Sequence, residues 1–212
     1  GYADFGFRGS EDIKTPHIDK IAYDGIIFNN AYVSASVCSP SRAGLLTGMY
    51  QQRFGHECNL DSDVNNSFDP DQITIAEALR TKGYNTGLIG KWHLGDKKQN
   101  HPLNNGFDYF WGFISGARDY FYLPNEKLKK SIRNVVENNS NTEFEGYLTD
   151  ALGNKAVDFV DKNHEENNPF FLFLSFNAPH TPMQAKKEVL EKFKDNPRKV
   201  YASMMWSMDQ AV

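Results

Sequence analysis

One run of apolar residues limits the folds open to this chain more than any other feature. Phe170–Phe176 reads FFLFLSF and is bounded by Pro169 and Pro179. The run is far shorter than the roughly 18 residues that a membrane span needs, and no other apolar run reaches that length. A short, uninterrupted apolar run is typical of a parallel strand that is buried on both faces. Such strands are covered by helices on both sides, so we expect an α/β fold.

The remaining pattern alternates strands and helices. Gly25–Val33 and Tyr84–Ile89 are rich in strand-forming residues, and we expect a strand at each. Thr74 and Glu77 have the spacing of a capping box and predict a helix that ends near Gly83. Helical spacing predicts further helices over a short stretch ending at residue 48, over 147–163 and over 201–212. Together these elements predict a largely parallel sheet between helices.

Two segments lack this periodicity. Asn59–Asp71 is polar and predicts a loop. Residues 101–146 are aromatic at first and rich in asparagine later, and a segment of this length predicts a binding loop or lid inserted into the fold. The sequence opens at Gly1 without a methionine and closes at Val212 within a predicted helix, so we interpret residues 1–212 as part of a single domain.

Composition excludes several classes of protein. With 40% hydrophobic and 24% charged residues, the chain has the make-up of a folded globular protein. The 23 basic and 27 acidic residues give a net charge of −4, which argues against nucleic-acid binding. Cys38 and Cys58 are too few for a disulfide scaffold, although they could form one bridge, so the redox compartment stays open.

Five chemically capable side chains follow the three predicted strands. Cys38 and Arg42 follow the first strand, Lys91 and His93 follow the second, and His180 follows the third. Each has a structural explanation when it is considered alone: a small buried cysteine, a hydrogen-bonded histidine or a solvated charge. Ligands of parallel sheets bind at the carboxyl ends of the strands, so the shared edge favours a functional site.

The local sequences around these residues are more specific. Ser36–Gly48 reads SVCSPSRAGLLTG and Gly83–Gly95 reads GYNTGLIGKWHLG. Both closely resemble the hallmark segments of the type I sulfatases of the alkaline-phosphatase-like superfamily. Lys14–Ala22 and Asn177–Pro182 resemble further segments of that family, so the similarity extends over the whole chain. The resemblance implies a mixed, mostly parallel sheet sandwiched by helices, incomplete at both ends, without the family's smaller C-terminal subdomain.

The resemblance also implies a role for each of the five side chains. Cys38 would be oxidised by a maturation enzyme to Cα-formylglycine, whose hydrate attacks sulfur and later expels sulfate by collapsing to the aldehyde. Arg42 would anchor the formylglycine, and Lys91 would bind a sulfate oxygen. His93 would take a proton from the formylglycine hydroxyl. His180 would assist departure of the leaving group.

A divalent metal, usually Ca²⁺, is a further implication of the resemblance. Its Asp pair would precede Gly1 and its Asp-Asn pair would follow Val212, which leaves residue 38 as formylglycine the one expected ligand in this chain. Asp4 matches an aspartate of the family that is not a ligand. We therefore expect this piece alone to be inactive and the parent protein to be the enzyme.

The predicted function is hydrolysis of sulfate esters, with a sulfated carbohydrate favoured over a simple aryl sulfate. His101 begins a segment that resembles sulfatases of the N-acetylgalactosamine-6-sulfatase and arylsulfatase A type and is a candidate substrate contact, and His56 is a candidate for lining the pocket. Three alternatives stay open: a phosphonate or phosphate ester hydrolase, a binder of sulfated glycans without catalysis, and an enzyme that uses an unmodified Cys38 thiol. The expected compartment is periplasmic or secreted in a bacterium, and lysosomal or secreted in an animal.

Overall fold

The computed structural model of the protein describes residues 1–59, 68–122 and 134–212, so parts of both predicted irregular segments lie outside it. The described helices are α1 (Pro16–Asp24), α2 (Cys38–Thr47), α3 (Ile75–Arg80), α4 (Leu148–Glu165), α5 (Lys187–Lys192) and α6 (Lys199–Gln210). The described strands are β1 (Asn85–Lys91), β2 (Tyr109–Phe113), β3 (Val135–Glu137), β4 (Ser140–Thr142) and β5 (Phe170–Ser175). Short 3₁₀ turns occur at Gly6–Arg8, Gln51–Phe54, Lys98–Asn100 and Pro102–Asn104.

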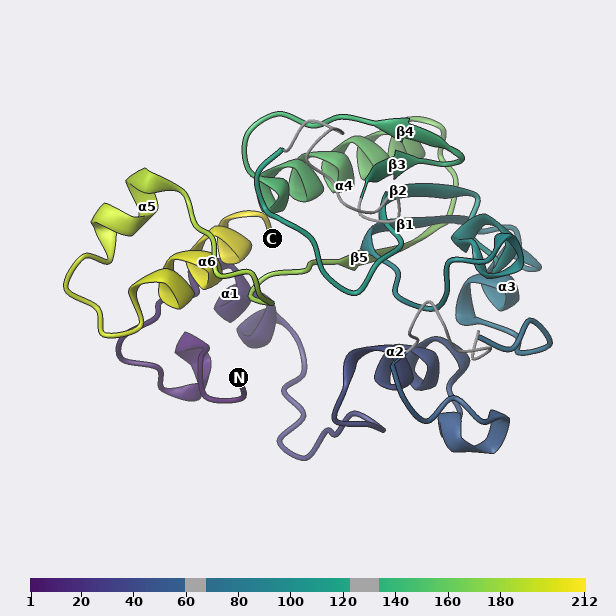
Figure 1. Ribbon diagram of the computed structural model, residues 1–212, viewed down its shortest axis with the longest axis horizontal. Helices are drawn as coiled ribbons and strands as arrows, with labels where there is room; N and C mark the ends of the chain where they lie inside the picture. Colours follow the sequence, from purple (N-terminus) through teal and green to yellow (C-terminus); the bar gives the residue numbers. More distant parts are fainter. Residues whose placement is uncertain (60–67, 123–133) are drawn as a thin grey trace.

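In the described part of the chain, five strands form one mixed sheet in the order β4-β3-β2-β1-β5 (Figure 1). β1 pairs in parallel with both β2 and β5, and β3 and β4 extend the sheet in antiparallel fashion beyond β2. The predicted α/β class is therefore confirmed. The three parallel strands end at Lys91, Phe113 and Ser175, which lie at one edge of the sheet.

Helices cover the sheet on both faces, because successive residues of a strand point to opposite sides. Leu88 of β1 packs in a core cluster with residues of α2 and α3, whereas its neighbour Ile89 packs in a second cluster with α4. β5 follows the same alternation: Phe171 joins the first cluster and Leu172 the second. This arrangement places the start of α2 beside the carboxyl ends of β1 and β5.

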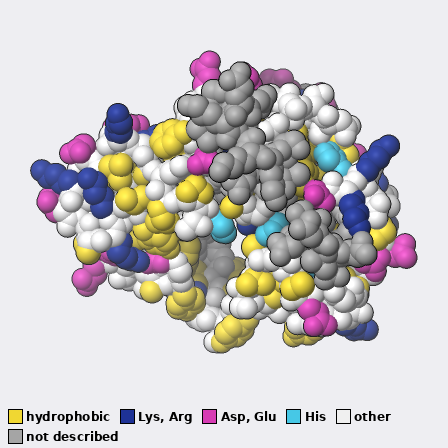
Figure 2. All heavy atoms as spheres, viewed as in Figure 1, with side chains coloured by type: hydrophobic (Ala, Val, Ile, Leu, Met, Phe, Trp, Pro, Cys, Tyr) yellow, Lys and Arg dark blue, Asp and Glu magenta, His cyan; other side chains and the backbone are white. Residues whose placement is uncertain are grey.

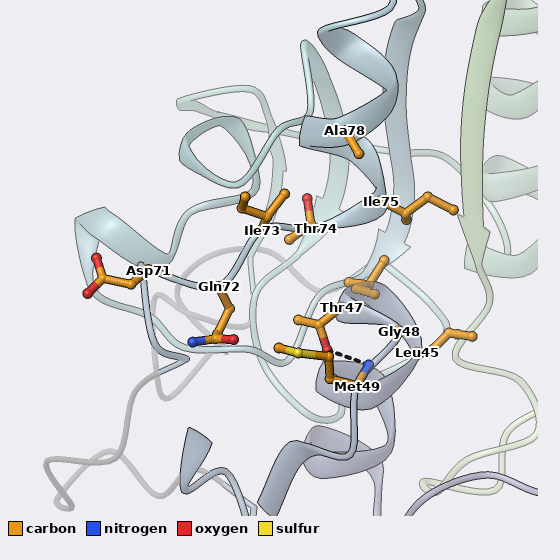
Figure 3. Close-up of a pocket in the computed structure, with 11 residues that line it drawn as sticks. Leu45, Thr47, Gly48, Met49, Asp71, Gln72, Ile73, Thr74, Ile75 and Ala78 are labelled. Carbon is orange, nitrogen blue, oxygen red and sulfur yellow. Dashed lines mark hydrogen bonds between the residues drawn. The ribbon is translucent and has the colours of Figure 1, made fainter. Parts of the chain in front are cut away.

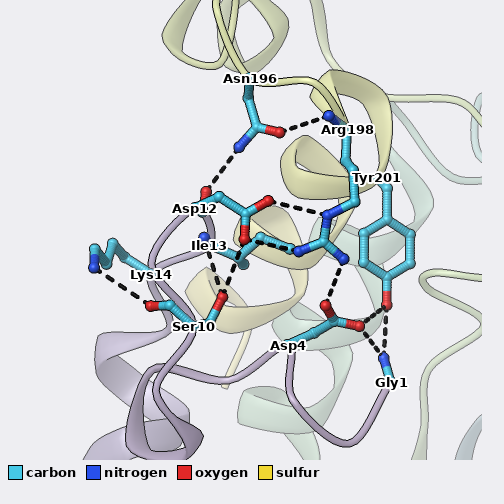
Figure 4. Close-up of polar contacts among 9 residues, drawn as sticks. All are labelled: Gly1, Asp4, Ser10, Asp12, Ile13, Lys14, Asn196, Arg198 and Tyr201. Carbon is cyan, nitrogen blue, oxygen red and sulfur yellow. Dashed lines mark hydrogen bonds and ion pairs between the residues drawn. The ribbon is translucent and has the colours of Figure 1, made fainter.

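The N-terminal segment is held against α6 by a polar cluster (Figure 4). Arg198 donates to Asp4 Oδ1 at 2.5 Å and to the two carboxylate oxygens of Asp12 at 2.7 and 3.0 Å. Tyr201 Oη donates to Asp4 Oδ2 at 2.8 Å. Hydrogen bonds from Arg198 and Tyr201 lower the pKa of Asp4. The Asp4 carboxylate is thus engaged in structural contacts, in keeping with its expected role as a non-ligand.

The predicted helices are confirmed. α3 begins with the expected capping box, in which Thr74 Oγ1 accepts from the Glu77 amide at 3.1 Å and Glu77 Oε2 accepts from the Thr74 amide at 2.8 Å. α2 ends at Gly48, whose φ of +66° is the left-handed conformation that glycine adopts most readily. Across the described residues, no helix is long and apolar enough to cross a membrane.

The predicted strand over Gly25–Val33 is wrong. The segment is irregular, and its apolar side chains face solvent, with Ile26 81% and Tyr32 88% exposed. Arg8 contacts it by donating to the Phe28 carbonyl at 3.1 Å. A strand-forming sequence becomes a strand only where another strand can pair with its backbone, and no described strand pairs with this segment.

The prediction of an inserted lid over residues 101–146 is wrong for the part that forms β2. This strand lies between β1 and β3, and three of its aromatic side chains are buried: Phe110, Trp111 and Phe113. Its aromatic residues are core residues rather than a binding surface. The prediction failed because a strand buried on both faces shows no alternation of polar and apolar residues.

The strand predicted over Phe170–Phe176 is confirmed as a parallel strand, but its burial on both faces is not. β5 lies at the edge of the described sheet, most of its side chains are half-buried, and Phe170 is 36% exposed. An apolar run therefore identified the strand correctly, whereas its exposure depends on what else pairs with that edge.

Candidate active site

Cys38 is the first residue of α2 and follows an extended Val37. Its thiol is half-buried, forms no disulfide, and lies 3.3 Å from Asn59 Oδ1, which also accepts from the Ser39 amide at 3.0 Å. A surface pocket of about 390 Å³ opens beside it and is lined by Cys38, Arg42, Val33, Ser36, Ser41 and Leu45, among others. Residue 38 is therefore accessible from solvent at the start of a helix.

Arg42 lies one helical turn after Cys38 and connects α2 to the edge of the sheet. Its guanidinium donates to the carbonyls of Lys91 and Trp92, the latter at 2.6 Å, and to Ser175 Oγ at 2.6 Å. Burial lowers the pKa of Arg42 to about 10, and the charge of Cys38 acts in the opposite direction. Arg42 thus remains a cation at neutral pH and fixes residue 38 relative to the ends of β1 and β5.

Lys91 ends β1 and is 4% exposed. Burial lowers its pKa and the positive charge of Arg42 lowers it further, whereas the charge and a hydrogen bond of Cys38 raise it. No described carboxylate contributes to these shifts. Two buried cations without a neighbouring carboxylate favour the binding of an anion.

His93 has an unusual backbone conformation. Its φ is +57°, a left-handed value that a non-glycine residue rarely adopts. Its amide donates to the Ile114 carbonyl at 3.0 Å, and its own carbonyl accepts from Ser39 Oγ at 2.8 Å. The imidazole lies against Gly116, where an added Cβ would be 2.6 Å from ring atoms. The backbone and the ring of His93 are therefore both fixed by neighbours.

The imidazole of His93 is neutral at physiological pH. Burial, followed by the positive charges of Lys91 and Arg42, lowers its pKa to about 3. His180 and His56 lower it further, so both histidines lie within electrostatic reach of the ring. Its Nδ1 is buried without a hydrogen-bond partner among the described residues. A neutral imidazole with a lone pair available can accept a proton.

His180 approaches from the loop after β5 and is exposed. Its Nδ1 lies 2.7 Å from the Thr181 carbonyl, which can only accept, so Nδ1 carries the proton and Nε2 is left to interact with a ligand. Its backbone is held by Tyr120, whose hydroxyl donates to the His180 carbonyl at 2.8 Å and to the Asn177 carbonyl at 2.9 Å. His180 is thus an oriented side chain on the open side of the site.

The structure brings five sequence-predicted side chains to one place: Cys38, Arg42, Lys91, His93 and His180. Histidine side chains are visible beside a hollow near the middle of the face drawn in Figure 2. The arrangement combines a residue that can become a nucleophile, two cations and two imidazoles. It can bind a tetrahedral oxyanion and move protons beside it.

The other two candidate histidines have different surroundings. His101 packs edge-on against Phe110 at 5.5 Å between ring centroids, accepts from the Leu103 amide, and is not among the groups that shift the pKa of His93. The structure therefore does not bring His101 to the cluster. His56 is buried, and its Nε2 lies 2.8 Å from Ser39 Oγ, so it lies behind Cys38 rather than lining the pocket.

Sequence reasoning did not single out several residues that contact this cluster. They are Ser39, Asn59, Gly116 and Ser175. Ser39 lies inside the Cys-Ser-Pro-Ser-Arg motif and Ser175 lies in the apolar strand, so their positions could have suggested a role. Asn59 and Gly116 give no such signal, because only the folded chain brings them to Cys38 and His93.

A larger pocket of about 590 Å³ lies between the end of α2 and the start of α3 (Figure 3). It is lined by Leu45, Met49, Ile73, Ile75 and other mainly apolar residues. None of the five clustered side chains lines it. We therefore do not assign the candidate site to this pocket, although it is larger than the pocket beside Cys38.

Comparison with known proteins agrees with the geometry. The family described as Sulfatase matches residues 1–212, which is the whole chain. The chain belongs to the sulfatase family. Relatives of this sulfatase include mouse (Mus musculus) arylsulfatase J, 32% identical over 100% of the chain and 36% of the relative, and human (Homo sapiens) N-acetylgalactosamine-6-sulfatase, 33% identical over 90% and 39%. The chain thus spans well under half the length of these relatives.

Solved structures give the same result. The crystal structure of Ps i-CgsB in complex with k-i-k-neocarrahexaose superimposes with a TM-score of 0.94 at 41% identity, covering 100% of this sulfatase chain and 50% of that one. The match confirms that the sheet and helices described above have the arrangement of this family.

The described residues do not by themselves fit the expected calcium. They contain no group of three or more His, Cys, Asp or Glu side chains that could hold a metal ion. Around Cys38 the charged neighbours are Arg42 and Lys91, which repel a cation. The surroundings of residue 38 in this sulfatase chain do fit a formylglycine, because the position is accessible and next to hydrogen-bonding groups.

Proposed function

We propose that this sulfatase chain carries the nucleophile-bearing half of an enzyme that hydrolyses sulfate esters. The observation that carries the proposal is the approach of Cys38 to two cations, Arg42 and Lys91, with no carboxylate of the described residues among the groups that shift their pKa values. A sulfate ester brings the negative charge that such a site lacks. The nearby imidazoles of His93 and His180 provide proton transfer on either side of the reacting group.

The Cα-formylglycine that the family resemblance implies at position 38 would supply, when hydrated, a hydroxyl nucleophile for sulfur. Lys91 and Arg42 would bind the sulfate oxygens and stabilise the charge that develops on them. His93, which is neutral, would accept a proton from the hydroxyl that remains when sulfate is released. His180, whose Nδ1 is engaged by the Thr181 carbonyl, would donate a proton from Nε2 to the leaving oxygen.

A sulfated carbohydrate is the substrate class we propose. The support comes from relatives: one relative is named N-acetylgalactosamine-6-sulfatase, and the structural neighbour Ps i-CgsB was solved in complex with k-i-k-neocarrahexaose. The formylglycine-generating maturation enzyme and the calcium ion are further proposals from the family. The proposed compartment is periplasmic or secreted in a bacterium, and lysosomal or secreted in an animal.

The test begins with the full-length protein produced together with its maturation system. Peptide mass spectrometry across residue 38 is expected to find an aldehyde, trapped with a hydrazide, while Cys58 keeps its thiol as an internal control. The matured protein is then expected to release sulfate from sulfated oligosaccharides, and a Cys38→Ala variant is not.

Two results would overturn the proposal. If Cys38 remains a thiol in protein from the native host while sulfated glycans bind without sulfate release, the protein is a binder. If matched phosphonate or phosphate esters are cleaved faster than sulfate esters, the same site acts on phosphorus. Each result selects one of the alternatives that the sequence left open.

A further inference from the structure

A buried histidine behind the candidate site has no role in the chemistry described so far. His56 is 4% exposed, and its ring packs against Phe54 and Phe68 with ring centroids 6.4 and 6.2 Å apart. Burial lowers its pKa, so the ring is neutral. Its polar contact runs from Nε2 to Ser39 Oγ at 2.8 Å. Burying a polar ring nitrogen inside an aromatic cluster costs free energy unless that nitrogen forms a hydrogen bond.

The direction of this hydrogen bond follows from the partners of Ser39. Ser39 Oγ lies 2.8 Å from the His93 carbonyl, and a carbonyl oxygen can only accept. The single hydroxyl proton of Ser39 is therefore donated to His93. His56 must in turn donate its Nε2 proton to Ser39 Oγ. A directed chain thus runs from His56 through Ser39 to the backbone of His93.

This chain ends on a strained part of the backbone. His93 has a φ of +57°, a left-handed conformation that a non-glycine residue keeps only where its surroundings hold it. The Ile114 carbonyl holds the amide of His93, and Ser39 holds its carbonyl. The imidazole of the same residue lies against Gly116, so its position depends on how this backbone is held.

The same serine also holds the nucleophile position. Ser39 follows Cys38 in the first turn of α2, and its amide donates at 3.0 Å to Asn59 Oδ1, the oxygen that the Cys38 thiol contacts. Ser39 is fully buried, so no water competes for these bonds. Ser39 therefore links residue 38, its neighbour in the chain, to the carbonyl of His93 through its side chain, and His56 contacts that side chain.

We infer that His56 is a positioning residue that acts through Ser39 to hold residue 38 and His93 in their reactive arrangement. The inference rests on the proposed function, since it assigns His56 to the same reaction. It does not place His56 in contact with substrate. Loss of the His56 donor should therefore slow turnover and leave substrate binding unchanged.

The test uses the matured full-length protein and two substitutions at one position. His56→Phe keeps the aromatic packing and removes the donor, whereas His56→Gln places an amide N–H near the position of Nε2. For His56→Phe we expect kcat to fall about 10- to 100-fold, the cost typical of misplaced reacting groups, with KM within about twofold. His56→Gln should recover most of kcat. Values are normalised to the formylglycine content of each variant.

Three further measurements separate positioning from packing. Ser39→Ala combined with His56→Phe should lose no more kcat than Ser39→Ala alone, because both act on one chain. Phe54→Leu, which perturbs the ring beside His56 and not the donor, should leave kcat within about twofold. An NMR spectrum of the histidine side chains should contain a protected Nε2 proton for His56 that disappears in Ser39→Ala, which is a readout independent of activity.

Several outcomes would overturn the inference. They are an unchanged kcat in His56→Phe, a raised KM at unchanged kcat, a failure of His56→Gln to restore kcat, and a His56 proton on Nδ1 alone. If the wild-type protein releases no sulfate while the Nε2 proton is present, the proposed function fails and the positioning contact stands. The two failures are therefore distinguishable.

Discussion

Arg42 Nη2 donates to Ser175 Oγ at 2.6 Å and joins the first helix turn after Cys38 to the last residue of β5. The same guanidinium donates to the carbonyls of Lys91 and Trp92 at the end of β1. One side chain therefore closes the gap between α2 and two parallel strands. The position of residue 38 depends on this connection as much as on the helix that carries it.

Arg42→Lys should impair the protein even though it keeps the charge, because a lysine ammonium cannot satisfy three acceptors in the planar arrangement of a guanidinium. We expect the free energy of unfolding to fall by about 1–3 kcal/mol as buried acceptors lose their donor. Urea denaturation measures this change. The control is Arg53→Lys, since the Arg53 side chain is exposed and should give wild-type stability. Equal stability of Arg42→Lys and wild type would contradict the argument.

Lys91→Ala should remove a buried cation from the oxyanion site. We expect kcat/KM for a sulfate ester to fall about 100- to 1,000-fold, the range found when one stabilising group is removed from an oxyanion. Steady-state kinetics of the matured full-length protein measures the change. Lys97→Ala, which alters an exposed lysine beyond the end of β1, is the matched control. A loss below threefold for Lys91→Ala would show that this lysine does not bind the reacting group.

The low pKa of His93 predicts a loss of stability in acid. Folding lowers the pKa of His93 from 6.5 to about 3, so between these values the unfolded chain binds more protons than the folded chain. Stability therefore rises with pH across this window and is lost as pH falls through it. Denaturation midpoints from pH 4 to about 6.5 should show a shallower slope in His93→Gln than in wild type. The carboxylates Asp4 and Asp12, whose pKa values folding lowers, are present in both proteins and contribute equally to the two slopes, so equal slopes would refute the assignment.

Gly116→Ala should disturb His93 because an added Cβ would lie 2.6 Å from its ring. We expect kcat to fall about 10- to 100-fold as the imidazole is displaced, with a small change in KM. Gly146→Ala is the control, since its Cβ would meet no atom within 4 Å although its φ of +71° is strained. The control should lose stability and keep turnover. Comparable turnover in both variants would contradict the argument.

Thr74→Ala should lower stability without affecting the site. It removes the bond from the Glu77 amide to Thr74 Oγ1 and the 2.9 Å bond from Thr74 Oγ1 to the Asn105 carbonyl, whereas the backbone amide of residue 74 can still donate to Glu77. We expect a loss of at least about 1 kcal/mol in the free energy of unfolding and an unchanged kcat. Thermal unfolding and the sulfate assay measure the two effects. Thr74→Ser, which retains the capping oxygen, should recover most of the stability.

The sequence predicted the elements with local signals. The capping box of Thr74 and Glu77, the apolar run of β5 and the spacing of α4 are each determined by neighbouring residues, and the structure confirms them. The strand expected over Gly25–Val33 is not formed, because a strand also requires a partner edge that no local pattern supplies. β2 was missed because it is buried on both faces, so its residues do not alternate between polar and apolar.

The sequence by itself determined the family and the residue types of the site, because the Cys-Ser-Pro-Ser-Arg and Gly-Lys-Trp-His segments are short and continuous in the chain. Only the tertiary structure decided which side chains hold them in place. Ser39, His56, Asn59 and Gly116 act on residue 38 and His93 through contacts between separate segments, and His101 packs against Phe110 instead. The distances around Cys38, the left-handed backbone of His93 and the burial of Lys91 all arise from packing between these segments, which no local sequence pattern encodes.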